Sequence, residues 1–213
     1  MLLPKRSKVQ KVIHHPALPY PEIGIFIAAL REQPGTASRS LEFLILTATR
    51  TSEIIYAEPA EFDLGAKHWT IPEGRMKKEK EHRIPLSARA LAIIKPFIDD
   101  ARRAGRQHVF PGGKIDQPLS NAAMSAVLDR MGIDPEKATV HGFRSTFRDW
   151  AGETTHHARE VIEAALSHQL EDKAEAAYAR GTLFAKRMHL MNDWAKYCNT
   201  PLPVQIPLDA ESA

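Results

Sequence analysis

The stretch HGFRSTFRDW, residues 141–150, is the most informative part of this sequence. If it is helical, its aromatic residues recur along one side of the helix, at Phe143, Phe147 and Trp150. His141 and Arg144 are three positions apart and therefore stand together on a neighbouring face. The stretch thus predicts a helix anchored in the core through aromatic rings, with a histidine and an arginine presented beside them.

The composition is that of a soluble globular protein large enough for one substantial domain. The chain has 213 residues, of which 43% are hydrophobic and 26% are charged. Lysine and arginine exceed aspartate and glutamate by 29 to 26, which permits a nucleic-acid partner without establishing one. Cys198 is the only cysteine, which excludes an internal disulfide and a thiolate zinc cluster and indicates a reducing, cytoplasmic setting. The apolar runs are shorter than the roughly 20 residues of a membrane span, so we expect no membrane association.

The apolar periodicity predicts a mainly α-helical protein with a small antiparallel β-sheet, of the α+β class. Around HWTIP (68–72) and HRIPLS (82–87) alternation replaces helical spacing, which indicates a β-hairpin with a basic arm between its strands. Helical spacing predicts helices at 21–32, 37–49, 88–104, 120–131, 142–153, 158–167, 172–180 and 183–197.

Three of these segments support more detailed expectations. After 37–49, Thr51 or Ser52 can cap a short following helix. Pro96 should kink the helix at 88–104. The residues of that helix expected to face inward are Leu91, Ile94, Phe97 and Ile98. Those of the last helix are Phe184, Met188, Met191 and either Trp194 or Ala195.

Composition also divides the chain into a domain and two flanking segments. Residues 1–16 are basic, contain prolines and are expected to form a linker. The domain is expected at 17–199. The segment 200–213 contains three prolines, so we expect a mobile tail and no helix.

Several polar residues are candidates for a site, although each has an ordinary structural explanation by itself. Arg50 lies three residues before Glu53, which is most simply an ion pair. Lys77 is one of several lysines on the hairpin arm and by default is solvated. His168 follows an apolar helix, where the helix dipole favours a histidine. Tyr178 in EAAYAR would ordinarily be a core or interface residue.

In their order and spacing, however, these residues resemble the catalytic domain of the tyrosine recombinases, the phage integrase family. LTATRTSEI is similar to the family's first-arginine motif, with Arg50 as the arginine and Glu53 as the following acidic residue. HGFRSTF matches its His-x-x-Arg box. ALSHQ matches the next histidine at His168, and AAYAR matches the nucleophile at Tyr178.

The resemblance extends to the hairpin and to both ends of the domain. MKKEKEHRIPLS is similar to the family's lysine hairpin and places Lys77 at the catalytic lysine, with Lys78 and Lys80 as close competitors. HHPALPY and RMHLMNDWAKY are similar to prophage integrases of enterobacterial type, so the resemblance covers about residues 14–197. It implies the integrase catalytic-domain fold.

Two positions and one region depart from the family pattern. Ala48 and Ser167 occupy positions where glycine is usual, and we expect altered packing there without loss of chemistry. Longer family members carry N-terminal DNA-binding domains. The chain is therefore expected to be the catalytic fragment of a longer integrase, with residues 1–16 as the link to a missing N-terminal region.

The resemblance implies site-specific DNA recombination by a covalent mechanism. The nucleophile would be the Tyr178 hydroxyl, which attacks a DNA phosphodiester and forms a 3′-phosphotyrosyl intermediate. His141 would act as base, and Lys77 would protonate the leaving 5′-oxygen. The donors to the phosphate oxygens would be Arg50, Arg144 and His168. Glu53 would support the site, and the residues expected to bind the DNA backbone are Arg75, Lys78, Lys80 and Arg83.

The implied partners are double-stranded DNA attachment sites and further protomers, as a tetramer on paired sites and a monomer without DNA. Residues 183–213 would contribute to protomer contacts, and the setting would be the cytoplasm of a bacterial host. No metal ion or cofactor is required. Two alternatives remain open: a type IB topoisomerase-like nicking and closing enzyme, and a non-catalytic DNA-binding remnant of an integrase. A metalloenzyme built on THH (155–157) is disfavoured, because HExxH-type spacing and a thiolate partner are both lacking.

Overall fold

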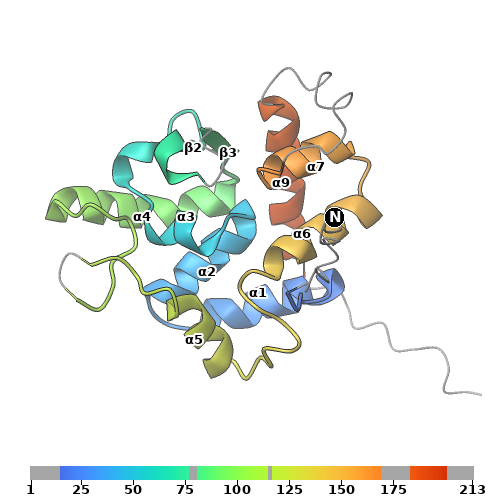
Figure 1. Cartoon of the computed structure of the whole chain (residues 1–213), viewed down its shortest axis with the longest axis horizontal. Coiled ribbons are helices and arrows are strands. Elements are labelled where there is room, and N and C mark those ends of the chain that lie inside the picture. The colour runs from blue at the N-terminus through green and yellow to red at the C-terminus, as the bar shows by residue number, and fades with distance from the viewer. Residues whose placement is uncertain (1–14, 77–80, 115–116, 169–182, 201–213) are drawn as a thin grey trace, which may run out of the picture.

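The computed structural model describes residues 15–76, 81–114, 117–168 and 183–200. Its α-helices are α1 (Ile23–Glu32), α2 (Thr36–Thr47), α3 (Thr51–Ile55), α4 (Ala88–Ala104), α5 (Ala123–Arg130), α6 (Phe143–Thr154), α7 (Arg159–Ala165) and α9 (Phe184–Cys198). Its strands are β1 (Phe62–Asp63), β2 (His68–Ile71) and β3 (His82–Pro85), and short 3-10 helices are η1 (Tyr20–Glu22), η2 (Pro59–Glu61) and η3 (Glu73–Arg75). The predicted α+β class, mostly helical with a small antiparallel sheet, is confirmed (Figure 1). The predicted helix at 172–180 lies outside the described residues.

The sheet contains the predicted hairpin and one short additional strand. Its order is β1-β2-β3, and both pairs are antiparallel. Trp69 on β2 pairs with Ile84 on β3, is fully buried, and stacks on Phe62 with ring centroids 5.2 Å apart. The same indole lies 5.8 Å from the ring of Phe43 on α2, so aromatic contacts hold the sheet to the helices.

Helix α2 runs through the centre of the domain and packs against α1, α4, α5 and α9 (Figure 1). Residues 40–47 of this helix are all buried, as expected for a helix surrounded on every side. The carboxylate of Glu42 is fully buried within it. Glu42 accepts hydrogen bonds from Nε of Arg31 on α1 at 2.7 Å and from Nε and Nη2 of Arg89 on α4 at 2.8 and 2.9 Å. One paired carboxylate therefore joins three helices.

The aromatic stripe predicted from residues 141–150 is confirmed. On α6, Phe143, Phe147 and Trp150 are at most 3% exposed. The Trp150 ring lies 4.9 Å from that of Trp194 on α9, and Phe147 meets Trp194 edge-on at 5.5 Å. The stripe fixes α6 against the C-terminal helix.

Helix α4 is unbroken at Pro96, and the kink expected there stays a prediction. The Pro96 ring is exposed, so water can solvate the carbonyl that loses its partner. Ile94 and Ile98 are buried as predicted, and Leu91 and Phe97 pack partly buried against the core.

In α9 the predicted apolar stripe is wrong at one position. Met188 is 36% exposed, whereas Arg187 is only 2% exposed. Arg187 is tolerated inside because its Nη1 donates to the carbonyl of Arg83 on β3 at 2.7 Å and its guanidinium lies 5.8 Å from the Phe184 ring centroid. Among the described residues, none of the helices is both long and apolar enough to cross a membrane.

Candidate active site

Arg50 and Glu53 form the pair predicted from their spacing, at the start of α3. The Glu53 carboxylate accepts from the backbone N–H of Arg50 at 2.7 Å and from its Nη1 at 2.7 Å. Arg50 therefore occupies the cap position, and the expected capping by Thr51 or Ser52 is wrong, because Glu53 satisfies this helix end from inside. The pair holds the Arg50 guanidinium, 25% exposed, at the edge of the core.

Arg144 is the most constrained of the predicted site residues. It projects from the first turn of α6 and is 6% exposed. Its Nη1 donates to the carbonyl of Ala48 after α2, and its Nη2 donates to the carbonyl of Leu166 after α7 at 2.7 Å. Burial, with the positive charge of Arg50, lowers the pKa of Arg144 to about 10. Two helix ends thus orient one guanidinium, which still carries further N–H donors.

The two carbonyls that hold Arg144 lie at or beside residues in the left-handed backbone region: one belongs to Ala48 itself, and the other belongs to Leu166, directly before Ser167. Ala48 has φ of 51° and Ser167 has φ of 53°. An L-residue with a Cβ is strained there, and glycine is not. The two departures from the family's glycines therefore place residues with a Cβ in a backbone conformation that favours glycine, and the expected change in packing stays a prediction.

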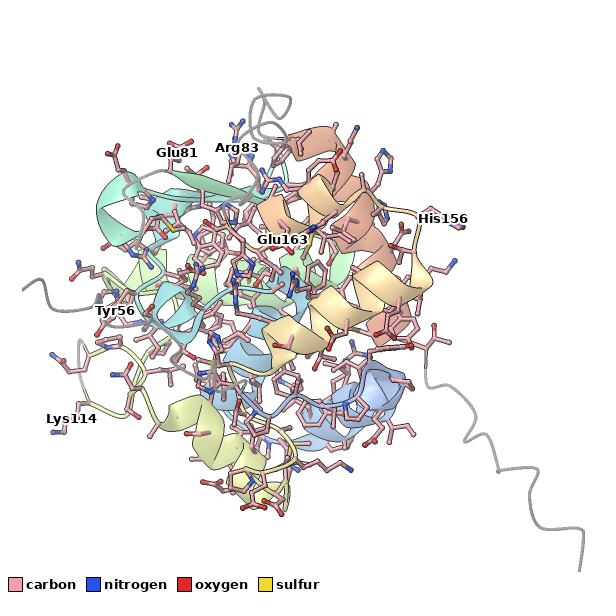
Figure 2. The ribbon with its side chains drawn as sticks, turned by 45° about the vertical axis from the view of Figure 1, so that its right-hand side comes forward. Tyr56, Glu81, Arg83, Lys114, His156 and Glu163 are labelled. Atoms are coloured by element: carbon pink, nitrogen blue, oxygen red, sulfur yellow. The ribbon has the colours of Figure 1, made fainter. Side chains whose placement is uncertain are left out.

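His168 lies at the end of α7 and contacts two charged residues. Its Nδ1 is 2.7 Å from Oε2 of Glu163, and its Nε2 is 3.2 Å from Nη2 of Arg144. Burial lowers the pKa of His168, and the nearby Arg144 and Arg50 act in the same direction, while Glu163 opposes them. Figure 2 labels Glu163 near the middle of the molecule, and its side chain is 8% exposed. Sequence reasoning missed Glu163, which would have been visible only as an acidic residue five positions before His168.

His141 precedes α6 and lies beside the segment that enters the domain. The rings of His15 and His141 are 4.5 Å apart. Burial lowers the pKa of His141, and His15, Arg144 and Arg50 lower it further, which favours the neutral ring. Gly142 approaches the backbone of Pro16 so closely that a Cβ would collide with the Pro16 carbonyl. This turn requires glycine for steric reasons.

His82 on β3 is a second residue that sequence reasoning missed. It is 8% exposed, and its ring hydrogen-bonds to the backbone of Ala165 in α7. Burial lowers its pKa to about 4, with further contributions from the positive charges of Arg187, Arg144 and Arg50. Its neighbours place His82 beneath the arginine cluster, in contact with the helix that precedes His168.

The remaining predicted residues fall into two groups. Those outside the described residues are Lys77, Lys78, Lys80 and Tyr178. Arg75 is described, and its guanidinium pairs with Glu61 and donates to the carbonyl of Glu53 at 2.8 Å, so here it braces α3. Arg83 is exposed on β3, at the rim labelled in Figure 2. Contacts of these residues with DNA remain predictions.

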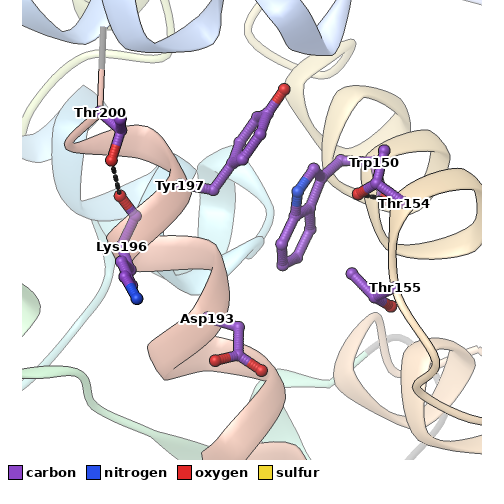
Figure 3. A pocket seen from close by; sticks show the side chains of 7 residues that line it. All are labelled: Trp150, Thr154, Thr155, Asp193, Lys196, Tyr197 and Thr200. Atoms are coloured by element: carbon purple, nitrogen blue, oxygen red, sulfur yellow. Dashed lines mark hydrogen bonds between the residues drawn. The ribbon is translucent and has the colours of Figure 1, made fainter. Parts of the chain in front are cut away.

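Two hollows adjoin these elements. One of about 270 Å³ is lined by His15, His141 and residues of α5 and the following loop. The other, of about 340 Å³, lies between the ends of α6 and α9, where the rings of Trp150 and Tyr197 are 5.4 Å apart (Figure 3). The second hollow contains none of the predicted catalytic residues. In the part of the chain that the structure describes, no group of three or more histidine, cysteine and acidic residues is arranged to hold a metal ion.

Comparison with known proteins gives one consistent result. The model of the phage integrase family matches residues 22–182. Prophage integrase IntA of Escherichia coli (strain K12) is 36% identical over 155 residues, which cover 71% of this chain and 36% of IntA. Prophage integrase IntZ of the same strain is 31% identical over 191 residues, which cover 88% of this chain and 46% of IntZ. The chain spans less than half the length of these relatives.

Solved structures of similar fold have lower sequence identity. The integrase from mycobacterium phage Brujita has a TM-score of 0.62 at 17% identity, over 97% of this chain and 64% of that chain. A lambda integrase dimer bound to a COC′ core site has a TM-score of 0.54 at 15% identity, over 83% of this chain and 63% of that chain. At such identities the likeness shows the fold, and it confirms the expected integrase catalytic-domain fold.

Proposed function

This chain belongs to the phage integrase family, and from that membership we propose that it catalyses site-specific DNA breakage and rejoining by tyrosine attack on a phosphodiester. One observation supports the proposal most directly. Three segments far apart in sequence bring Arg50, His141 with Arg144, and His168 into mutual electrostatic contact. Two guanidiniums that repel each other form a site suited to an anion, because a phosphate group would relieve their repulsion.

In the proposed reaction, the Tyr178 oxygen bonds to phosphorus and the bond from phosphorus to the 5′-oxygen breaks. His141 accepts the tyrosine proton, for which its lowered pKa suits it by keeping the ring neutral. Lys77 gives a proton to the leaving 5′-oxygen. The products are a 3′-phosphotyrosyl link and a 5′-hydroxyl, and the reverse steps rejoin the strands.

Arg50 and Arg144 bind the non-bridging oxygens of the phosphate, on which negative charge accumulates in the transition state. Their positions are set in advance by Glu53 and by the carbonyls after α2 and α7, so little reorganisation accompanies the reaction. The arginines supply the charge stabilisation that a metal ion supplies in other phosphoryl-transfer enzymes, and the proposed reaction uses no metal or cofactor. Double-stranded DNA is the proposed substrate, with further protomers, as a tetramer on paired sites, as proposed partners.

The test is incubation of the protein with supercoiled plasmid in EDTA, followed by a detergent quench. We expect relaxed plasmid and a covalent adduct that maps to Tyr178, and neither with Tyr178→Phe. Relaxation without exchange between DNA molecules would favour the topoisomerase-like alternative. Nicking or an adduct that survives in Tyr178→Phe would refute the assignment of the nucleophile.

A further inference from the structure

The contacts of His168 raise a question about the direction of its hydrogen bonds. Arginine carries only donors, so the 3.2 Å contact with Arg144 Nη2 makes Nε2 of His168 an acceptor. The proton of the neutral ring then resides on Nδ1, which donates to Glu163 at 2.7 Å. The ring is therefore held as the Nδ1–H tautomer, and its Nε2 has no proton to give.

Glu163 is itself held rigidly for this contact. Its Oε1 accepts from Nε and Nη2 of Arg148 at 2.9 and 2.8 Å, which leaves Oε2 for the histidine. The carboxylate is 8% exposed, whereas Arg148 is 52% exposed. The charge of Glu163 therefore acts on His168 with little screening by water.

When a phosphate binds, Nε2 of His168 has to donate a hydrogen bond, whereas in the free protein it accepts one. A phosphate oxygen that takes the Nη2 hydrogen of Arg144 faces an unprotonated Nε2, and two acceptors repel each other. Protonation of Nε2 by solvent removes the repulsion, because the imidazolium donates at both nitrogens. The charged groups around the His168 ring then act in both directions. The phosphate and Glu163 favour protonation of the ring, whereas Arg144, Arg50 and His141 disfavour it.

We propose that Glu163 is a positioning residue that fixes the tautomer of His168 and enables its Nε2 to take up a proton when the scissile phosphate binds. The idea rests on the proposed function, since it assigns the anion at this site to a DNA phosphodiester. It also separates the two histidines by role: His141 acts as a neutral base, and His168 acts as a charged donor. Substrate binding is thereby coupled to uptake of one proton.

The first test is a spectroscopic one that requires no DNA cleavage. Side-chain ¹⁵N NMR on the full chain gives the tautomer and pKa of each histidine, with His168→Gln identifying the resonance. We expect the Nδ1–H tautomer in the free protein and a rise in the pKa of His168 when sulfate, a tetrahedral oxyanion of fixed charge, is added. Glu163→Gln keeps an oxygen acceptor and nearly the same shape but removes the charge, so the proton affinity of His168 should fall about tenfold or more.

The matched control is Glu160→Gln, the same change one turn earlier on α7, at a partly exposed residue. It should leave the tautomer and pKa of His168 unchanged. An Nε2–H tautomer in the wild-type protein would overturn the proposal. So would equal pKa values of His168 in wild type and Glu163→Gln, with or without sulfate.

The second test is the pH profile of the Tyr178 adduct. Glu163→Gln should reduce the cleavage rate about tenfold at pH 8 and less at pH 6, where His168 is more readily protonated. If Glu163 has only a structural role, the cleavage rate of Glu163→Gln should fall by the same factor at every pH. That result would refute the coupling of phosphate binding to proton uptake by His168. If no adduct forms in any variant while the NMR results are as expected, the proposed function fails and the positioning by Glu163 stands.

Discussion

His82 makes the stability of this domain depend on pH in a window that can be calculated from the structure. The ring is buried on β3 against Ala165 and near three arginines, and it is neutral with a pKa of about 4. In the unfolded chain it regains its ordinary value of 6.5. The unfolded state therefore binds more protons between these two values, so the free energy of unfolding falls as the pH falls through this range.

The size of the effect follows from the two pKa values. The difference between a pKa of 6.5 and one of about 4 corresponds to roughly 3 kcal/mol in the free energy of unfolding. Each factor of ten in proton affinity contributes about 1.4 kcal/mol. By pH 5 about 2 kcal/mol of this is lost, because the unfolded histidine is then almost fully protonated and the folded one is not. His82→Gln lacks this titration. It should lower the stability at pH 7.5 and converge towards the wild type at pH 5.

The assay is urea unfolding followed by fluorescence of the buried tryptophans, at both pH values. The control is His156→Gln, which replaces an exposed histidine labelled at the periphery in Figure 2 by the same residue. A difference between wild type and His82→Gln that stays constant from pH 7.5 to pH 5 would refute the reasoning. It would mean that His82 keeps its ordinary pKa in the folded protein.

Three further substitutions, one of them with a control, test other features by the same unfolding assay. Glu42→Gln should lower the free energy of unfolding by about 3 kcal/mol, because it leaves arginines beside a buried uncharged group. The control Glu22→Gln, at a largely exposed ion pair, should lower it by less than about 1 kcal/mol, and equal losses would contradict the reasoning. Ser167→Gly should stabilise by about 1 kcal/mol through relief of the left-handed backbone, and a loss of stability would count against the strain. Gly142→Ala should cost about 2 kcal/mol by driving a Cβ into the carbonyl of Pro16, and a neutral result would show that this segment moves freely.

Local patterns were sufficient for the framework of the domain. The aromatic stripe of α6, the hairpin of β2 and β3, and most helices followed from periodicity, which depends only on the repeat of the helix or strand. The pairing of Arg50 with Glu53 also followed from spacing, because both lie on one turn. The order of the motifs indicated the family before any geometry was known, and the family match agrees.

For Arg187 and His82, which sequence reasoning did not identify as buried, the deciding partner lay far along the chain. Arg187 took the inward position predicted for Met188, because the carbonyl of Arg83, over a hundred residues away, accepts its hydrogen bond. The burial of His82 likewise depends on its contact with α7. Periodicity depends only on the polarity of neighbouring residues in the sequence. It therefore cannot reveal a distant hydrogen-bond partner that lowers the free-energy cost of burying a charged or polar side chain.

The sequence by itself thus determined the class of fold, the family, and which residues are candidates for the chemistry, because these depend on residue types and their spacing. Only the tertiary structure decided how the candidates are held. It placed Arg144 between the carbonyls after α2 and α7, gave His168 its tautomer through Glu163, and put Ala48 and Ser167 in left-handed conformations. Hydrogen-bond direction, desolvation and backbone strain depend on which surfaces meet, and helices distant in sequence meet only in the folded protein.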